Sequence, residues 1–133
     1  MVDIISYNSM LSVFYGKTKV NGQRLERIKT VTQPSVNISG EKTTYYTIII
    51  SDPDARLGDF LHWLVVNIDK TRYQEILSYY PPKHTSGVHR YNIYLLEQEH
   101  KLDIESFDRN EFDILDFIDK HLLHLKDTQF FTV

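Results

Sequence analysis

The stretch that decides the fold is residues 45–54, YYTIIISDPD, in which six aromatic or β-branched residues run into Ser-Asp-Pro-Asp. Such side chains pack well on a pleated sheet, and an apolar run without alternation is typical of a strand covered on both faces. Proline then ends the strand, because it fixes φ and has no amide hydrogen to donate. We therefore predict a buried strand over 45–50, followed by a rigid turn that carries Asp52 and Asp54.

Other strands are predicted on both sides of this one. Continuous or loosely alternating apolar stretches occur at residues 11–15, 36–38, 60–68, 90–98 and 128–133. Asn21-Gly22 offers a turn with positive φ after the first of them. Residues 73–80 fit a short helix or an irregular segment, which Pro81-Pro82 must end because the residue before a proline avoids the helical region.

The periodicity changes near the end of the chain. Apolar residues recur there at helical spacing, at Phe112, Leu115, Ile118, Leu122 and Leu125. Asp108 and Glu111 are suited to start this helix, because carboxylate oxygens accept from the free amides of a first turn. The sequence thus predicts a single domain over residues 1–133 that is mostly β, a sandwich-like fold with one substantial C-terminal helix.

Composition narrows the classes of function. The chain has 133 residues, a formal net charge of −3 and no cysteine, and it lacks a Lys/Arg run. A basic stripe is the usual mark of nucleic-acid binding, so we expect no nucleic-acid partner. The missing cysteine excludes disulfides and thiolate chemistry and suits a reducing compartment. No apolar stretch approaches the length of a membrane span, so we expect a cytoplasmic protein without one.

Three polar clusters interrupt the apolar strands, and burying their polar groups has a free-energy cost unless they find partners. They are Asp52-Pro53-Asp54, His62-Trp63 and the loop at residues 81–91, PPKHTSGVHRY. Each alone has an ordinary structural interpretation: an Asx-type turn, a satisfied core histidine, and a polar hairpin connection. Each is also suited to ligand binding, since loops on a rigid scaffold commonly carry sites.

The order of these clusters is far more specific than any one of them. A strand, Asp-Pro-Asp-Ala, His-Trp-Leu-Val-Val-Asn-Ile, Pro-Pro, Gly-Val-His-Arg-Tyr and a strand ending at Gln98 follow one another within residues 45–98. This arrangement resembles the phosphatidylethanolamine-binding protein family, which includes the Raf kinase inhibitor protein and the plant flowering-time regulators.

The resemblance implies a β-sandwich of two antiparallel sheets with few helices. It also implies a pocket at one end that takes phosphate-type anions, including the phosphoethanolamine head group of a lipid. By motif position, the ligand-binding residues are Asp52, His62, Pro82, His89 and Tyr91. The residues expected to support the pocket are Asp54, Arg56, Trp63, Gly87 and Arg90. No catalytic residue, metal ligand or cofactor is expected.

The sequence departs from the family pattern in three places. Arg56 replaces the usual proline after Asp-Pro-Asp-Ala, and the connection from Asp54 to His62 is short, which cuts back one rim of the pocket. The Gly-x-Gly before the diproline is missing, because Tyr79-Tyr80 precede Pro81 directly. Those glycines let a ligand approach the backbone closely. A bidentate contact from Arg56 to phosphate is one hypothetical compensation.

Three functions remain open from the sequence. The first is a regulatory module that binds a phosphate-containing small molecule or lipid head group and modulates a protein partner, as a kinase or protease inhibitor does. The second is a protein-interaction module that keeps the fold and has lost the ligand. The third is a metal-dependent hydrolase built on Asp52, His62 and His89, which the lack of a short-spaced histidine pair disfavours.

Overall fold

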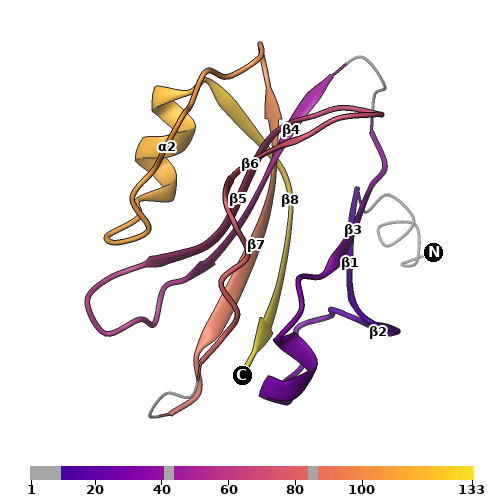
Figure 1. Cartoon of the computed structure of the whole chain (residues 1–133), viewed down its shortest axis with the longest axis vertical. Helices are drawn as coiled ribbons and strands as arrows, with labels where there is room; N and C mark the ends of the chain where they lie inside the picture. The colour runs from indigo at the N-terminus through magenta and orange to yellow at the C-terminus, as the bar shows by residue number, and fades with distance from the viewer. Residues whose placement is uncertain (1–9, 41–43, 84–86) are drawn as a thin grey trace, which may run out of the picture.

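The computed structural model describes residues 10–40, 44–83 and 87–133, which form two packed antiparallel sheets and a short helix (Figure 1). The three-stranded sheet has the order β2-β1-β3, with β1 at Leu11–Tyr15, β2 at Thr18–Lys19 and β3 at Ser35–Ile38. The five-stranded sheet has the order β6-β5-β4-β7-β8. Its strands are β4 at Tyr45–Asp52, β5 at Phe60–Ile68, β6 at Gln74–Leu77, β7 at Arg90–Gln98 and β8 at Leu123–Thr132. The mostly β fold predicted from the sequence is confirmed.

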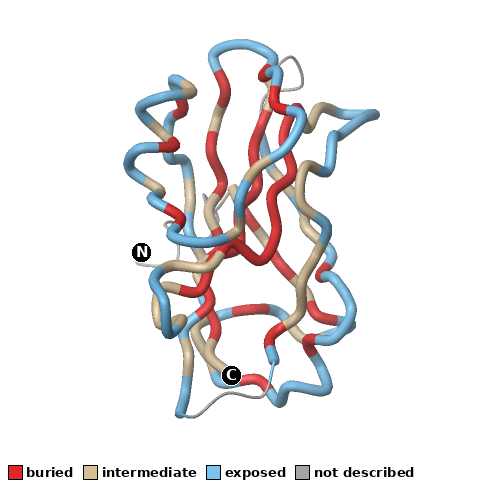
Figure 2. Tube along the Cα trace, turned by 60° about the vertical axis from the view of Figure 1, so that its left-hand side comes forward, coloured by how far each residue is buried: buried red, intermediate tan, exposed pale blue. Residues whose placement is uncertain are grey.

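The two most apolar strands lie in the interior of the larger sheet. Seven of the eight residues of β4 and seven of the nine of β5 are buried, as the red stretches in Figure 2 show. One core fills the space between the sheets and includes Val13, Ile50 and Tyr91. A second core lies on the opposite face of the larger sheet and includes Leu64 and Phe117. Burial on both faces explains why these strands lack an alternating pattern.

The C-terminal helix is shorter than the sequence predicted. Helix α2 spans Ile114–Lys120 and begins at the cap Asp113, whose carboxylate accepts from the amides of Leu115 and Asp116. Asp108 and Glu111 therefore lie before the helix rather than starting it. The chain leaves the helix at Leu122, where φ is +54°, and then pairs with β7 along ten residues of β8. The backbone hydrogen bonds between β8 and β7 stabilise a strand here more than the apolar spacing stabilises a longer helix.

Residues 74–77 form an edge strand, so the prediction of a helix or irregular segment over 73–80 was wrong for its first half. β6 pairs with β5 and has two exposed residues, Gln74 and Glu75, followed by two half-buried ones. Such a polar edge strand lacks the aromatic and β-branched pattern by which strands are recognised.

Hydrogen-bonded tyrosines join the two sheets. The hydroxyl groups of Tyr15 and Tyr79 lie 2.7 Å apart, and Tyr79 donates to the carbonyl of Thr30 at 2.7 Å. Tyr79 has only one hydroxyl hydrogen, so Tyr15 must donate to Tyr79. Burial raises the pKa of Tyr79 to about 12, which keeps the pair neutral. The Tyr15 ring also meets Phe131 edge-on at 5.3 Å, and Phe131 stacks on Tyr91 at 5.2 Å.

Candidate functional site

The Asp-Pro-Asp turn at the end of β4 holds one carboxylate in a fixed position. Asp52 Oδ1 accepts from the backbone amide of Asp54 at 2.8 Å, and Asp52 Oδ2 lies 2.7 Å from His89 Nδ1. The loop before β7 thereby joins the end of β4, as the resemblance implied. Both carboxylate oxygens of Asp52 are thus engaged inside the protein, and Asp52 orients the ring of His89.

A β-bulge places the second histidine. Ile50 pairs with Trp63 and Ser51 pairs with Leu61, so His62 is the extra residue on β5. Bulges re-aim side chains, and here the His62 ring meets Tyr91 edge-on at 5.2 Å. His62 Nδ1 donates to the Tyr80 carbonyl, which can only accept. No local pattern in residues 60–68 indicates this bulge.

The hydrogen bonds at Nδ1 decide what the two histidines offer a ligand. With the hydrogen on Nδ1, a neutral imidazole presents Nε2 as an acceptor, and neither Nε2 has a hydrogen-bond partner within the described part of the chain. Burial lowers the pKa of His62, with opposing contributions from the Tyr80 carbonyl and the Asp52 carboxylate. With hydrogen on Nδ1, each ring can accept a hydrogen bond at Nε2 from a phosphate monoanion, or donate one from Nε2 to a dianion once that nitrogen is protonated.

The site is nearly closed. Tyr91, Asp52 and His62 are 1%, 4% and 5% exposed, and the His89 side chain is 13% exposed. The Phe60 and Tyr80 rings pack against His62, with centroid distances of 5.1 and 5.7 Å. His89 is therefore the member of this group that solvent reaches most easily.

Tyr80 is the clearest reason for this closure. It stands directly before Pro81, where the family pattern expects a glycine. Its backbone binds His62 twice, since the Tyr80 amide donates to the His62 carbonyl at 2.8 Å and the Tyr80 carbonyl accepts from the ring. A glycine would keep both backbone bonds and leave the ring of His62 uncovered on this side.

Two of the residues expected to support the pocket form an ion pair. Arg90 binds Asp54 through Nε and Nη2, at 2.9 and 2.8 Å. This bidentate contact lowers the pKa of Asp54 to about 2. Together with the amide of Arg90, which also donates to Asp54, it fixes the turn beside the loop before β7.

The other residues predicted for the pocket are Trp63, Pro82, Arg56 and Gly87. Trp63 Nε1 donates to Glu75 at 2.7 Å and so holds the edge strand, and Pro82 is buried. Arg56 is exposed and forms no ion pair with a described residue, so nothing in its contacts places it at the site. Gly87 has a φ of +84°, and residues 84–86 of the same loop lie outside the described residues.

Sequence reasoning missed Arg109, which holds the wall of the site. Its guanidinium donates to the carbonyls of Leu61, His62 and Ser78 at 2.8–3.2 Å, and it lies 5.3 Å from the centre of the Tyr80 ring. Burial lowers its pKa. No local pattern marks this residue, because its partners are about 30 to 50 positions away and are backbone atoms.

A second missed residue is the carboxylic acid Asp59. Its Oδ1 is buried without a hydrogen-bond partner among the described residues. Burial, and to a smaller extent the carboxylates of Asp52 and Asp54, raise the pKa of Asp59 to about 6. The segment between β4 and β5 therefore contains an acid that titrates well above the usual range of an aspartate.

The described residues contain neither a metal-binding cluster nor a helix that could span a membrane. Outside the gaps at 1–9, 41–43 and 84–86, no three His, Asp or Glu side chains are grouped so as to hold a metal ion. In the same part of the chain, no helix has the length and hydropathy needed to cross a bilayer.

Comparison with known proteins identifies relatives of the chain. The family model described as phosphatidylethanolamine-binding protein matches residues 10–131. Protein MOTHER of FT and TFL1 homolog 2 of Oryza sativa subsp. japonica and Protein FLOWERING LOCUS T of Arabidopsis thaliana are each 34% identical to it over 110 residues. Both matches cover 74% of this chain and 63% of the relative, so the chain spans less than two thirds of their length.

Solved structures share the fold at low sequence identity. The carboxypeptidase Y inhibitor, solved in complex with its cognate proteinase, superposes with a TM-score of 0.79 at 19% identity over 92% of this chain and 81% of that one. A phosphatidylethanolamine-binding protein from Plasmodium falciparum gives 0.69 at 15% identity, over 92% and 83%. The fold, the motif order from Asp52 to Tyr91 and the family match agree, and the chain belongs to the phosphatidylethanolamine-binding protein family.

Proposed function

We propose that this chain is a regulatory binding protein whose Asp52–His62–His89 site accepts a phosphate-type anion and which modulates a protein partner. The observation that carries the proposal is the 2.7 Å bond from His89 Nδ1 to Asp52, since it orients the imidazole and leaves Nε2 for a ligand. Phosphoethanolamine and inorganic phosphate present the same group to this histidine.

The kind of role is supported by the names of relatives. Protein TERMINAL FLOWER 1 and Protein FLOWERING LOCUS T are named for effects on flowering, and the structural neighbour is an inhibitor in complex with its proteinase. The family is named for binding, which agrees with the prediction that the chain is not an enzyme. A cytoplasmic location is part of this proposal and rests on the sequence alone.

One observation favours the alternative of an interaction module without a ligand. The ring of Tyr80 covers His62, and the site residues are almost fully buried. A preformed ligand site is usually an open cleft that encloses most of its ligand. On this alternative, Asp52 and His89 hold the loop before β7 and no anion reaches them.

The test is a titration of isotope-labelled protein with O-phosphoethanolamine and with inorganic phosphate, followed by backbone amide shifts. We expect saturable shifts at Asp52, His62 and Tyr91 with a dissociation constant of about 1 mM or below, and their loss in His62→Ala. The exposed histidine His124 provides the control variant His124→Ala, which should bind as the wild type does. Amides near Asp52 that stay unmoved at saturating ligand would leave the interaction module as the better account.

A further inference from the structure

A cavity lies next to the nearly closed histidine site. It has a volume of about 440 Å³ and is lined by residues from the segment before and into η1 (Arg27–Thr30), from both ends of the loop before β7, and from the chain after β8. The cavity adjoins the first site through the backbone, because His89 and Val133 exchange two hydrogen bonds of 3.0 Å. None of the histidine-site residues Asp52, His62, His89 and Tyr91 lines this cavity.

Three cations line this cavity, namely Arg24, Arg27 and Lys83. All three are exposed, and none forms an ion pair with a described residue, whereas Arg90 nearby is engaged by Asp54. Lys83 does contact the ring of Tyr80, at 4.9 Å from its centre. In a chain of net charge −3, three cations without an acidic partner around one cavity form a local field that attracts anions.

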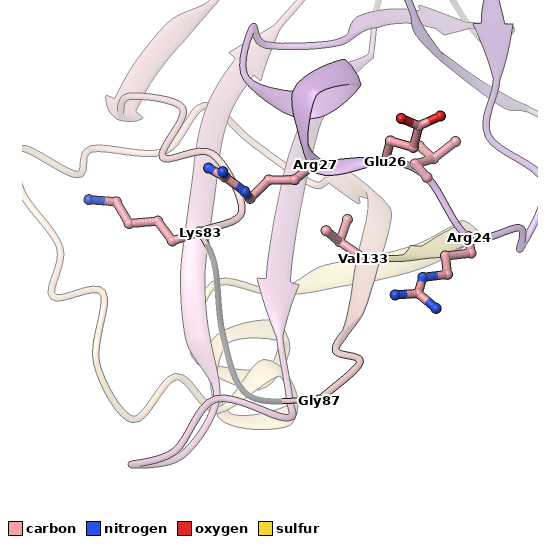
Figure 3. A pocket seen from close by; sticks show the side chains of 7 residues that line it. Arg24, Glu26, Arg27, Lys83, Gly87 and Val133 are labelled. Atoms are coloured by element: carbon pink, nitrogen blue, oxygen red, sulfur yellow. The ribbon is translucent and has the colours of Figure 1, made fainter.

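The charged side chains of the lining point in different directions, and the Arg24 guanidinium lies on the other side of Val133 from Arg27 and Lys83 in Figure 3. Figure 3 shows Arg27 and Lys83 extending toward the same side, whereas the carboxylate of Glu26 points away from them. Glu26 is the acidic residue of the lining, and it forms no ion pair with these cations. A guanidinium and an ammonium are both groups that bind the oxygens of a phosphate ester.

We propose that this cavity is a second anion site, which takes the phosphorylated side chain of a peptide segment in a protein partner. A membrane surface is disfavoured because anionic bilayers are usually bound by clusters of about four to eight Lys or Arg residues, whereas the described lining has three and a single phosphate needs fewer. Ile28 and Val88 adjoin lining residues in sequence and are 71% and 51% exposed, so apolar contacts are available beside the phosphate. The site goes beyond the proposed histidine site and does not depend on it.

The test is an amide-shift titration of the full chain with N-acetyl-phosphoserine amide and with N-acetyl-serine amide. We expect saturable shifts at residues 24–27 and 133 with the phosphorylated probe alone, weakening as salt rises. The double variant Arg27→Gln/Lys83→Gln should bind about tenfold more weakly, at about threefold per charge. The double variant Lys17→Gln/Arg72→Gln removes the same exposed charges away from the cavity and should bind as the wild type does.

Each contrary result overturns the proposal. Equal shifts with both probes, or equal affinity of the two double variants, would show that these cations do not read a phosphate. Sedimentation with vesicles of phosphatidylserine and phosphatidylcholine that is lost in Arg27→Gln/Lys83→Gln would assign the cavity to a lipid surface. Signals at Asp52, His62 and Tyr91 report the histidine site in the same spectra, so the two proposals can fail separately.

Discussion

At the scale of single residues, the burial of the Asp59 carboxylate lowers the stability of the folded protein at neutral pH. Its pKa is raised by burial to about 6, compared with about 3.9 in an unfolded chain. Between these values the folded state binds more protons than the unfolded state, so the contribution of Asp59 to stability falls as the pH rises from about 4 to 6.

Replacing this acid by a neutral isostere should therefore stabilise the fold. We expect Asp59→Asn to raise the free energy of unfolding at pH 7 by about 1 kcal/mol, a figure reduced for solvent screening of a partly exposed group. The gain should shrink as the pH falls toward 4. Urea unfolding at pH 7 and pH 4.5 measures it, with the exposed change Asp103→Asn as the control for lost charge. An Asp59→Asn gain that is equal at both pH values would contradict the assigned shift.

Tyr80 is the second residue whose replacement is informative. Tyr80→Gly removes the ring that covers His62 but keeps the backbone bonds between residues 62 and 80. If closure limits binding, the variant should bind O-phosphoethanolamine about threefold or more tightly, because access to a pocket without a covering ring costs less. Tyr73→Gly, at a position 68% exposed, is the matched control. Calorimetry that finds no gain over this control would show that the ring is not the barrier.

At the scale of elements, α2 is anchored by a single buried residue. Phe117 is 2% exposed and packs against Phe107 and Phe112, with ring centroids at 5.3 and 5.7 Å. Phe117→Ala should cost about 3–5 kcal/mol of unfolding free energy. Leu115, which the helical spacing placed on the apolar face, is 75% exposed, so Leu115→Ala should cost under about 0.5 kcal/mol. Chemical denaturation that shows comparable losses for both would contradict the packing of this helix.

The elements that sequence reasoning predicted well are the three interior strands of the larger sheet. β4, β5 and β7 have strong apolar and aromatic runs, and their ends fall within two residues of the predicted ones. The end of α2 at Lys120 and the edge strand β6 were missed because both depend on long-range pairing. Local periodicity carries no information about a ladder formed with a partner far along the chain.

At the scale of the whole molecule, the motif order predicted which segments meet, and the chain's departures decided how open the site is. The pairing of Asp52 with His89 agrees with the resemblance, although the contact joins residues 37 positions apart. The bulge at His62, the guanidinium of Arg109 and the cover of Tyr80 come from three-dimensional packing, which no short motif encodes. Tyr80 stands where the family pattern has a glycine, and its ring covers His62 and closes the site.

The two sites together suggest how the molecule engages a partner. The histidine site and the Arg24–Arg27–Lys83 cavity are joined through the bonds between His89 and Val133. An anion at the first and a phosphorylated side chain at the second would lie on neighbouring parts of one end of the sandwich. This arrangement fits a regulator in which a small ligand and a protein segment affect each other's affinity.

The proposed site requires that His62 and His89 receive an anion through Nε2. Imidazole nitrogen NMR measures the protonation of these atoms. Without ligand at pH 7.5, both rings should carry hydrogen on Nδ1, as their bonds to Tyr80 and Asp52 require. Saturating O-phosphoethanolamine should shift the Nε2 signals of both toward the protonated form, more strongly at pH 6.5 than at pH 7.5. Nε2 signals that do not move with ligand at either pH would contradict the account and leave the fold without an anion at its histidines.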